Sequence, residues 1–437
     1  MEIAFGLVFG VGKPKTKTKD KQTTMDAKKT LALNYWPRRT GVRWWSQFDR
    51  GELHEDMQRI AGFGVDDVRF CLVWEDVQPT PRKVDGVVLR AFERALDIAG
   101  ESGLRVVAGL FPVAISGALF VPRWVANPDL LSDIMRTGML PDEVTNLPAV
   151  VYEGAYRPSR ARNLFRDTAA VEAMRYQIGE VIGYFGSHPA VRYWQLGEGL
   201  ERVHTPAAND AVAAWFSQMV ETARAAYSGA RLLGATSAHG LLHRGGPRPE
   251  HIAAACDLVG VTLDVPLPLP GFQVNNPDAI EFFYTLASAL AGRPVAALGL
   301  GLATAPNNRP TTAGDMLYGE SVATPLVSVQ QQAEFLGTML ERLRNAGAPL
   351  IVLAEYSDYP PGLWREAPLD RSIRSRTIGL VEAGGREKGD SIGALERWNT
   401  TGKGAVQQLQ SDFDPERYWH DPRNECARLW QAWMRER

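Results

Sequence analysis

The chain has little cysteine. Its 437 residues include three, Cys71, Cys256 and Cys426, which lie far apart in the sequence. An odd count argues against a disulfide framework, and the spacings match no zinc-binding motif. We therefore expect no metal and no other cofactor. The same scarcity favours a reducing compartment, so the predicted location is cytoplasmic, with secretion as the alternative.

The chain also lacks an excess of charge and a long apolar run. Its 48 basic and 50 acidic residues give a net charge of −2, which argues against a nucleic-acid partner or an anionic membrane surface. No stretch of about 18 apolar residues occurs, so no membrane span is expected.

The N-terminus departs from the order of a secretory signal. Apolar "MEIAFGLVFGVG" precedes basic "KPKTKTKDKQ", whereas a signal peptide has its charge first. We expect residues 1–28 to form a flexible leader, with the folded domain beginning near Met25. A signal peptide and an apolar docking element are the alternatives.

From residue 31 onward, short apolar runs alternate with amphipathic segments, a pattern typical of βα units and a parallel sheet. Three segments between the runs predict helices that end near a glycine: 51–64, 89–103 and 329–347. Eight runs predict strands: 31–36, 66–74, 104–111, 190–197, 231–237, 257–264, 294–302 and 350–357.

Eight strands joined by crossovers predict an α/β fold of the (β/α)8 type, the TIM barrel. An open doubly wound sheet is the alternative, and the lack of a glycine-rich phosphate loop after the first strand argues against it. We place the barrel at residues 29–385, with a long insertion at 112–189 that carries an extra helix or a lid. Residues 386–437 are predicted to be a helical extension packed on the outside of the barrel.

Chemistry in such a barrel lies at the carboxyl-terminal ends of the strands. The phrases found there are, in order, "LNYWPRRTGVRWW", "VRFCLVWEDVQP", "WQLG", "LGLATAP" and "SDYPPGLW". With these phrases in this order, the chain resembles the clan A glycoside hydrolases, close to their cellulase-like members. The resemblance implies a retaining mechanism, with a Glu acid/base after the fourth strand and a Glu nucleophile after the seventh.

Both catalytic positions implied by the resemblance hold glycine. "WQLGEG" places Glu198 on an Asn position and Gly199 on the acid/base position, while "ALGLGLATAP" places Gly299 on the nucleophile position. Glycine can neither transfer a proton nor attack a sugar. The resemblance is therefore to a degenerate member with no intact catalytic residue.

Further positions of the implied sugar site are also altered. Ala114 stands where the resemblance implies a His, Thr262 and Asp264 replace a His and a Tyr, and Ala354 replaces a Trp. These changes predict a pocket that is wider and less polar than a sugar site. The full set of expected ligand-binding residues is Trp36, Arg69, Trp74, Glu75, Ala114, Glu198, Thr262, Asp264, Ala354, Glu355 and Asp358.

Glu198 has two interpretations. It is a relocated acid/base, with Asp264 or Glu355 as a substitute nucleophile, or it is an ion-pair partner of Arg69, since buried charges are normally paired. Glu75, Asp264 and Glu355 are alternative partners for the same guanidinium. A working pair would need its carboxyl groups about 5–5.5 Å apart.

Several other side chains could be assigned a function, but a structural role is the better interpretation of each. Glu201, Arg202 and His204 are typical of a solvated loop. His239, His243 and His251 lack a companion carboxylate motif for a metal. The tryptophans that could serve as sugar platforms are more typical of packing residues: Trp44, Trp45, Trp124, Trp194 and Trp364.

Three functions follow from these observations. The first is a pseudo-glycosidase that acts as a binding, regulatory or assembly protein, with a carbohydrate, an apolar small molecule or a protein as its partner. The second is an active glycosidase with a carboxylate pair rebuilt from Glu198 and Asp264 or Glu355. The third is a structural subunit of a larger assembly, which would need a broad exposed apolar patch.

Overall fold

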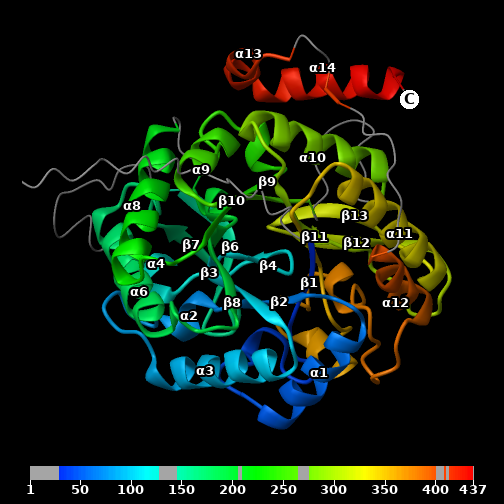
Figure 1. Ribbon diagram of the computed structural model, residues 1–437, viewed down its shortest axis with the longest axis horizontal. Helices are drawn as coiled ribbons and strands as arrows, with labels where there is room; N and C mark the ends of the chain where they lie inside the picture. The colour runs from blue at the N-terminus through cyan, green and yellow to red at the C-terminus, as the bar shows by residue number, and fades with distance from the viewer. Residues whose placement is uncertain are drawn as a thin grey trace, which may run out of the picture.

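A computed structural model describes residues 29–126, 145–204, 209–263, 275–399, 408–409 and 413–436, without the side chains of 145–149 and 158–160. Its centre is a closed barrel of eight parallel strands in the order β1-β14-β11-β10-β9-β8-β3-β2 (Figure 1). The strands are β1 (Thr30–Asn34), β2 (Asp67–Cys71), β3 (Arg105–Pro112), β8 (Val191–Glu198), β9 (Leu232–Ser237), β10 (Leu258–Thr262), β11 (Ala296–Leu300) and β14 (Leu350–Leu353).

Each of the eight predicted strands is a strand of this barrel, so the predicted (β/α)8 fold is confirmed. Several predicted strands are too long at their carboxyl ends. β14 ends at Leu353 rather than at residue 357, and β2 ends at Cys71 because Trp74–Val77 forms the short helix α2. Apolar residues continue past these strand ends because the loops at the mouth of the barrel are themselves buried.

Helices surround the barrel (Figure 1). The long ones are α1 (Arg50–Gly62), α3 (Gly86–Glu101), α6 (Thr168–Phe185), α8 (Asp210–Ala226), α10 (Pro277–Ala291) and α11 (Val329–Asn345), with shorter α9 (Pro249–Ala255) and α12 (Gly389–Glu396). Local sequence sets their ends. Asp49 caps α1, and Ser328 and Gln331 form a capping box at the start of α11.

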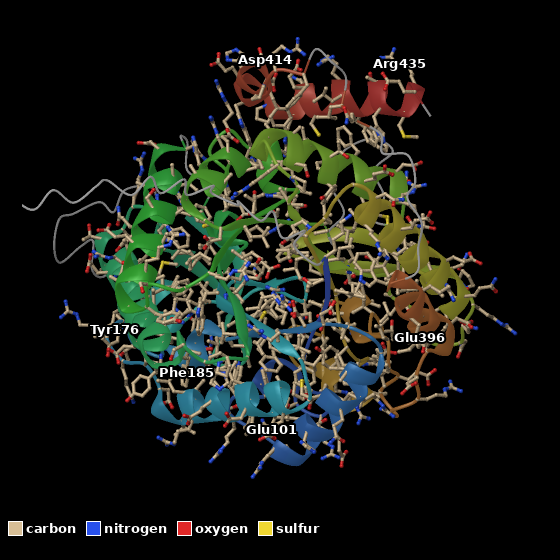
Figure 2. The ribbon with its side chains drawn as sticks, in the orientation of Figure 1. Glu101, Tyr176, Phe185, Glu396, Asp414 and Arg435 are labelled. Atoms are coloured by element: carbon tan, nitrogen blue, oxygen red, sulfur yellow. The ribbon has the colours of Figure 1, made fainter. Side chains whose placement is uncertain are left out.

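Two layers of apolar packing hold the barrel together. Small and branched side chains from the strands fill its interior: Ala32, Val107, Leu233, Ala235, Leu258, Ala296, Leu298, Leu350 and Val352. A much larger cluster fills the space between strands and helices, where side chains crowd in Figure 2. The interior is a packed core and not a channel, as expected for this fold. Any ligand site must therefore lie beyond the strand ends.

Three antiparallel hairpins extend the loops between the barrel elements. β4 (Ala114–Ile115) pairs with β5 (Ala118–Leu119), β6 (Thr145–Tyr152) with β7 (Ala155–Ala161), and β12 (Thr311–Leu317) with β13 (Glu320–Leu326). The first two lie in the predicted insertion after β3, together with the short helix α4 (Arg123–Ala126). That insertion was expected to carry a helix or a lid, and the part of it that the structure describes contains both this helix and the two hairpins.

The C-terminal segment forms α13 (Pro415–His420) and α14 (Pro422–Arg435), which lie across α10 (Figure 1). Phe282 of α10 contacts Trp430 and Trp433 with ring centroids 5.4 and 5.8 Å apart. Figure 2 labels Asp414 and Arg435 at the two ends of this layer. The predicted helical extension on the outside of the barrel is thus present, whereas the domain boundary at residue 385 stays a prediction. None of the helices in the described ranges combines the length and apolarity needed to cross a membrane.

Candidate functional site

A small cavity of about 60 Å³ lies where the carboxyl ends of the strands meet, and we call it the axial cavity. Its lining comes from five barrel-strand ends and from loops above them: Asn34, Trp36, Arg69, Cys71, Ala114, Ile115, Ser116, Gly117, Glu198, Gly299, Ala354, Glu355, Arg374, Ser375 and Ile378. Ligand sites usually measure about 300–1,000 Å³. The axial cavity is therefore far smaller than a sugar site.

A buried ion pair occupies the base of the axial cavity. The Arg69 guanidinium, from β2, binds the carboxylate of Glu198, the last residue of β8. Both residues are more than nine-tenths buried, with 5% and 8% of their surface exposed. Thr262 donates its hydroxyl to Glu198 Oε1 at 3.2 Å. Of the partners considered for Arg69, the structure brings it together with Glu198.

The second carboxylate of the axial cavity is tied to the same network. Asn34 Nδ2 donates to Glu355 Oε2 at 3.2 Å, and Arg69 Nη1 donates to Asn34 Oδ1 at 3.4 Å. Cys71 Sγ lies 3.8 Å from the same amide oxygen. Burial raises the pKa of the Cys71 thiol, so this cysteine is held in its neutral, unreactive form.

The two glycines at the implied catalytic positions have backbones that disfavour a side chain. Gly199 has φ 73° and Gly299 has φ 78°, in the left-handed region where any residue with a Cβ is strained. At Gly199 an added Cβ would overlap the methyl group of Ala114. The backbone at both positions therefore suits glycine better than a residue with a side chain.

Loops close the axial cavity from above. Asp315 of β12 is the centre of the closure: its carboxylate accepts the backbone N–H groups of Ile373 and Arg374 at 2.8 and 3.2 Å and the Thr324 hydroxyl at 3.1 Å. This clamp holds the turn η4 (Arg374–Arg376) against the β12–β13 hairpin.

The β4–β5 hairpin joins the closure from the other side. The Tyr318 N–H donates to the Gly117 carbonyl at 2.6 Å, which links the tips of the two hairpins. The sequence prediction of a wide, weakly polar pocket is wrong. Small residues do replace larger ones at the strand ends, but Arg374, Ser375 and Ile378 enter from a distant loop and occupy the space.

Four expected ligand-binding residues are not among those that line the axial cavity, although one of them, Thr262, contacts the lining residue Glu198. Trp74 is fully buried and donates its indole N–H to Gln78 Oε1 at 2.8 Å. Glu75 accepts the Glu153 backbone N–H at 2.9 and 3.0 Å. Burial raises the pKa of the Glu75 carboxyl. Asp358 pairs with Lys388 beside a different hollow, and Asp264 lies outside the described residues.

The remaining candidates have structural surroundings. Glu201 accepts the Ser237 hydroxyl at 2.6 Å and His204 is buried, so neither belongs to a solvated loop. His239 and His243 face each other with Nε2 atoms 3.2 Å apart, and burial lowers both pKa values, that of His239 to about 3. Across the described ranges, no group of three or more potential metal ligands occurs.

The tryptophans divide into packing residues and one that borders open space. Trp44, Trp45 and Trp194 are almost completely buried, and Trp124 packs edge-on against Trp74. Trp364 is partly exposed and lines a hollow of about 500 Å³ between the loops that follow β11 and β14. We call this hollow the rim cleft. Trp364 and Asp358 are the two lining residues that the sequence analysis singles out, and the others come from irregular loops that show no pattern in the sequence.

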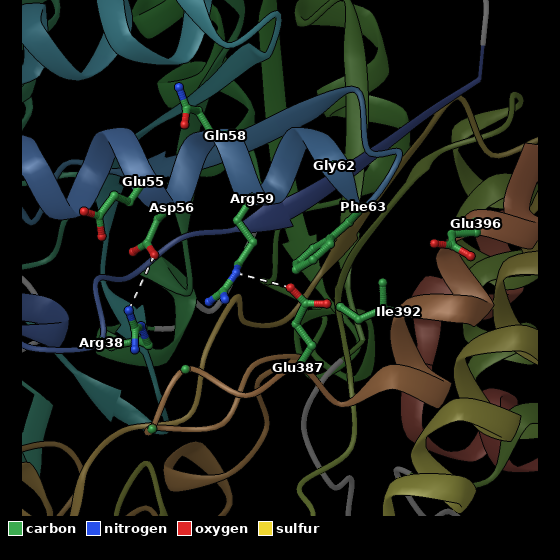
Figure 3. Close-up of a pocket in the computed structure, with 12 residues that line it drawn as sticks. Arg38, Glu55, Asp56, Gln58, Arg59, Gly62, Phe63, Glu387, Ile392 and Glu396 are labelled. Atoms are coloured by element: carbon green, nitrogen blue, oxygen red, sulfur yellow. Dashed lines mark ion pairs between the residues drawn. The ribbon is translucent and has the colours of Figure 1, made fainter.

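A third hollow, of about 780 Å³, lies between α1 and the loop before α12 (Figure 3). Arg59 pairs with Glu387 at 3.2 Å, and Arg38 approaches Asp56 at 4.0 Å. The Asp56 carboxylate also accepts hydroxyls from Tyr35 and Tyr356, which follow β1 and β14. These contacts join the first and last units of the barrel and indicate a structural role.

The closed barrel, with its polar cluster at the strand ends, has the fold of the clan A glycoside hydrolases, and solved structures show this directly. GH5_18 from Streptomyces cattleya in complex with GlcNAc matches with a TM-score of 0.70 at 18% identity, over 93% of this chain and 90% of that one. A single-residue variant of GH5_18 from the same organism, in complex with Manβ1-4GlcNAc, matches with a TM-score of 0.66 at 18% identity, over 87% of this chain and 83% of that one.

The exo-beta-1,4-mannosidase Op5Man5 from Opitutaceae bacterium strain TAV5 is also similar. Its TM-score is 0.64 at 21% identity, over 85% of this chain and 59% of that one. No protein-family model matches the sequence, and no curated protein matches it. The likeness is thus one of fold, at identities too low to carry a function with it.

Proposed function

We propose that this chain is a glycoside hydrolase-like barrel that does not hydrolyse glycosides and acts instead as a carbohydrate-binding protein. One observation carries the first half: glycine occupies both implied catalytic positions, with backbone angles that disfavour any side chain. The second half is supported by the solved structures of the same fold that hold GlcNAc and Manβ1-4GlcNAc. A regulatory or assembly role would follow from such binding.

The alternative, an active glycosidase with a rebuilt carboxylate pair, has less support. Its acid/base would be Glu198, yet this carboxylate is neutralised by Arg69 and largely shielded from solvent. Its partner Glu355 is held by the Asn34 amide. A retaining pair must also accommodate a sugar between its carboxyl groups, and a cavity of about 60 Å³ does not. The same volume argues against an apolar small molecule on the barrel axis.

A turnover assay tests the proposal. The full chain is incubated with Manβ1-4GlcNAc and with aryl β-mannosides and β-glucosides, beside the Glu198→Gln variant. We expect no turnover by the wild-type chain above that of the variant. Hydrolysis by the wild type that Glu198→Gln abolishes would refute the proposal and establish the rebuilt pair.

A reversion variant provides the control for the backbone argument. Gly199→Glu combined with Gly299→Glu restores both carboxylates in the sequence. We expect this variant to stay inactive, because the left-handed backbone and the Ala114 methyl group prevent a productive geometry. Restored turnover would show that the two carboxylates alone had been lost.

A further inference from the structure

The rim cleft has the room that the axial cavity lacks. Its volume of about 500 Å³ falls within the range of about 300–1,000 Å³ usual for ligand sites. The loop after β11 forms one wall, with Asn307 and Asn308. The long segment after β14 forms the other, with Trp364. The cleft is therefore built from the carboxyl ends of two adjacent barrel strands, beside the axis and not on it.

The charges that line the rim cleft cancel. Its four charged residues form two pairs: Lys388 Nζ lies 2.9 Å from Asp358 Oδ1, and Arg386 donates to both carboxylate oxygens of Glu382 at 2.6 and 3.0 Å. Lys388 also donates to the Thr304 hydroxyl and the Gly379 carbonyl, at 2.9 and 2.8 Å. The charges of the lining residues therefore balance, which suits a neutral ligand. A further charge beside the cleft, the Arg376 guanidinium, donates to the backbone carbonyls of Leu369 and Asp370.

The rim cleft also presents an aromatic ring and two side-chain amides. The Trp364 indole N–H donates to the Tyr359 carbonyl at 2.8 Å, which fixes the ring while it stays partly exposed. The Arg376 guanidinium lies 5.2 Å from the ring centre. Asn307 and Asn308 are exposed, and the Asn308 side-chain oxygen accepts the Val329 N–H at 2.7 Å. An amide presents both donors and acceptors.

We propose that the rim cleft binds a neutral oligosaccharide, with Trp364 packing against the apolar face of a sugar ring and the Asn307 and Asn308 amides meeting its hydroxyl groups. Sugar rings combine apolar C–H faces with hydroxyls that both donate and accept, which is the combination that this cleft presents. The inference rests on the proposed function and names where its ligand binds: recognition has moved from the barrel axis to the rim.

Isothermal titration of the full chain with Manβ1-4GlcNAc and with cellobiose tests this site. We expect wild type to bind at least one of them and Trp364→Ala to raise the Kd by about tenfold, as loss of one aromatic contact typically does. Trp364→Phe keeps an aromatic face and should stay close to wild type. Tyr184→Ala, which removes an exposed aromatic ring from α6, should bind as wild type does.

Asn307→Ala guards against an effect on folding alone, because the Asn307 side chain is exposed. It should weaken binding and leave the unfolding temperature unchanged. Binding of neither sugar by wild type, or equal affinity in Trp364→Ala, Asn307→Ala and wild type, would overturn the site. Equal affinities would leave the proposed carbohydrate binding in place, whereas binding of neither sugar would remove it as well. Turnover that Glu198→Gln abolishes would refute the other half of the proposed function, the lack of hydrolysis, and would leave binding at the rim unaffected.

Discussion

The axial cavity and the rim cleft are neighbouring hollows at the same end of one barrel, and each contains a buried acid–base pair. Arg69 and Glu198 pair in the first, and Lys388 and Asp358 in the second. Their volumes differ from about 60 to about 500 Å³. The difference shows that a buried ion pair can accompany either a nearly filled mouth or an open cleft. Space above the strand ends decides where a ligand can bind.

The origin of that difference lies in the loops. The β12–β13 hairpin clamps the η4 turn through Asp315, and this places Arg374 and Ile378 over the barrel axis. The rim cleft lies outside this clamp. In the axial cavity the members of the ion pair thus neutralise each other where the closed mouth removes them from water.

The largest expected effect comes from breaking the axial ion pair. Arg69→Met leaves the Glu198 carboxylate buried, with Thr262 as its remaining hydrogen-bond donor among the contacts described. We expect the free energy of unfolding to fall by about 3–5 kcal/mol, as for other buried pairs that lose one partner. Urea unfolding at neutral pH measures this loss.

The matched control removes both charges. Arg69→Met combined with Glu198→Leu should recover most of the lost stability, because similarly sized apolar side chains often replace a buried pair at little cost. If the double variant is as unstable as Arg69→Met alone, the two charges do more than neutralise each other. That result would point to a specific role for the Arg69 side chain.

The corresponding change in the rim cleft should cost less and depend on pH. Lys388→Met leaves Asp358 with the Gly379 N–H as a donor at 2.9 Å. Burial raises the pKa of the Asp358 carboxyl to about 6, although Lys388 opposes the rise. The unpaired group can therefore take up a proton. We expect a loss of about 3 kcal/mol at pH 8 and a smaller loss at pH 5.

The sign follows from linkage between proton binding and folding. Asp358 has a folded pKa above its unfolded value, so its contribution to stability is largest at low pH and falls as pH rises through about 6. Unfolding of Lys388→Met and wild type in urea between pH 5 and pH 8 measures the change. A loss of stability in Lys388→Met that is larger at pH 5 than at pH 8 would contradict the raised pKa of Asp358.

The smallest of the three effects on stability, but the most direct test of the closure, comes from Asp315. Asp315→Ala leaves the Ile373 and Arg374 N–H groups without their acceptor, at a cost of about 1–3 kcal/mol. The opened mouth should expose Cys71 to a thiol reagent. Peptide mass spectrometry then follows its labelling rate against that of the other two buried cysteines, Cys256 and Cys426.

Thr324→Val is the control for this variant, since it removes one donor to Asp315 and leaves the two backbone contacts in place. It should label Cys71 about as slowly as wild type does. Equal acceleration at all three cysteines in Asp315→Ala would indicate general unfolding. That result would contradict the inference that Asp315 holds the mouth closed. The small volume of the axial cavity relative to the rim cleft would then need another explanation.

Much of the barrel could be predicted from the chain itself. Each strand is an apolar run within a repeating pattern, and the helices predicted at 51–64, 89–103 and 329–347 are present as α1, α3 and α11, so local information sufficed for these elements. The glycines at 199 and 299 could be located because they lie within short phrases at strand ends. The sequence suggested that Arg69 pairs with a carboxylate, but it left four candidates, so the pairing with Glu198 could not be predicted uniquely.

The character of the site could not be predicted. Small residues at Ala114, Gly299 and Ala354 suggested an open pocket. The structure fills it with Arg374, Ser375 and Ile378, which lie in an irregular segment without periodicity. Trp74 and Glu75 were expected in the pocket because they follow β2 closely. The helical turn of α2 instead directs them toward Gln78 and the β6–β7 turn.

The sequence by itself determined the eight-stranded barrel and the glycines at positions 199 and 299, because strand periodicity and residue identity are local properties. Only the tertiary structure decided which charges meet, how much space is left on the axis and where an open cleft lies beside it. Those properties depend on contacts between loops more than a hundred residues apart, such as the Gly117 carbonyl with Tyr318. The volume of each cavity depends on how those loops pack together, so the sequence of one segment alone does not reveal it.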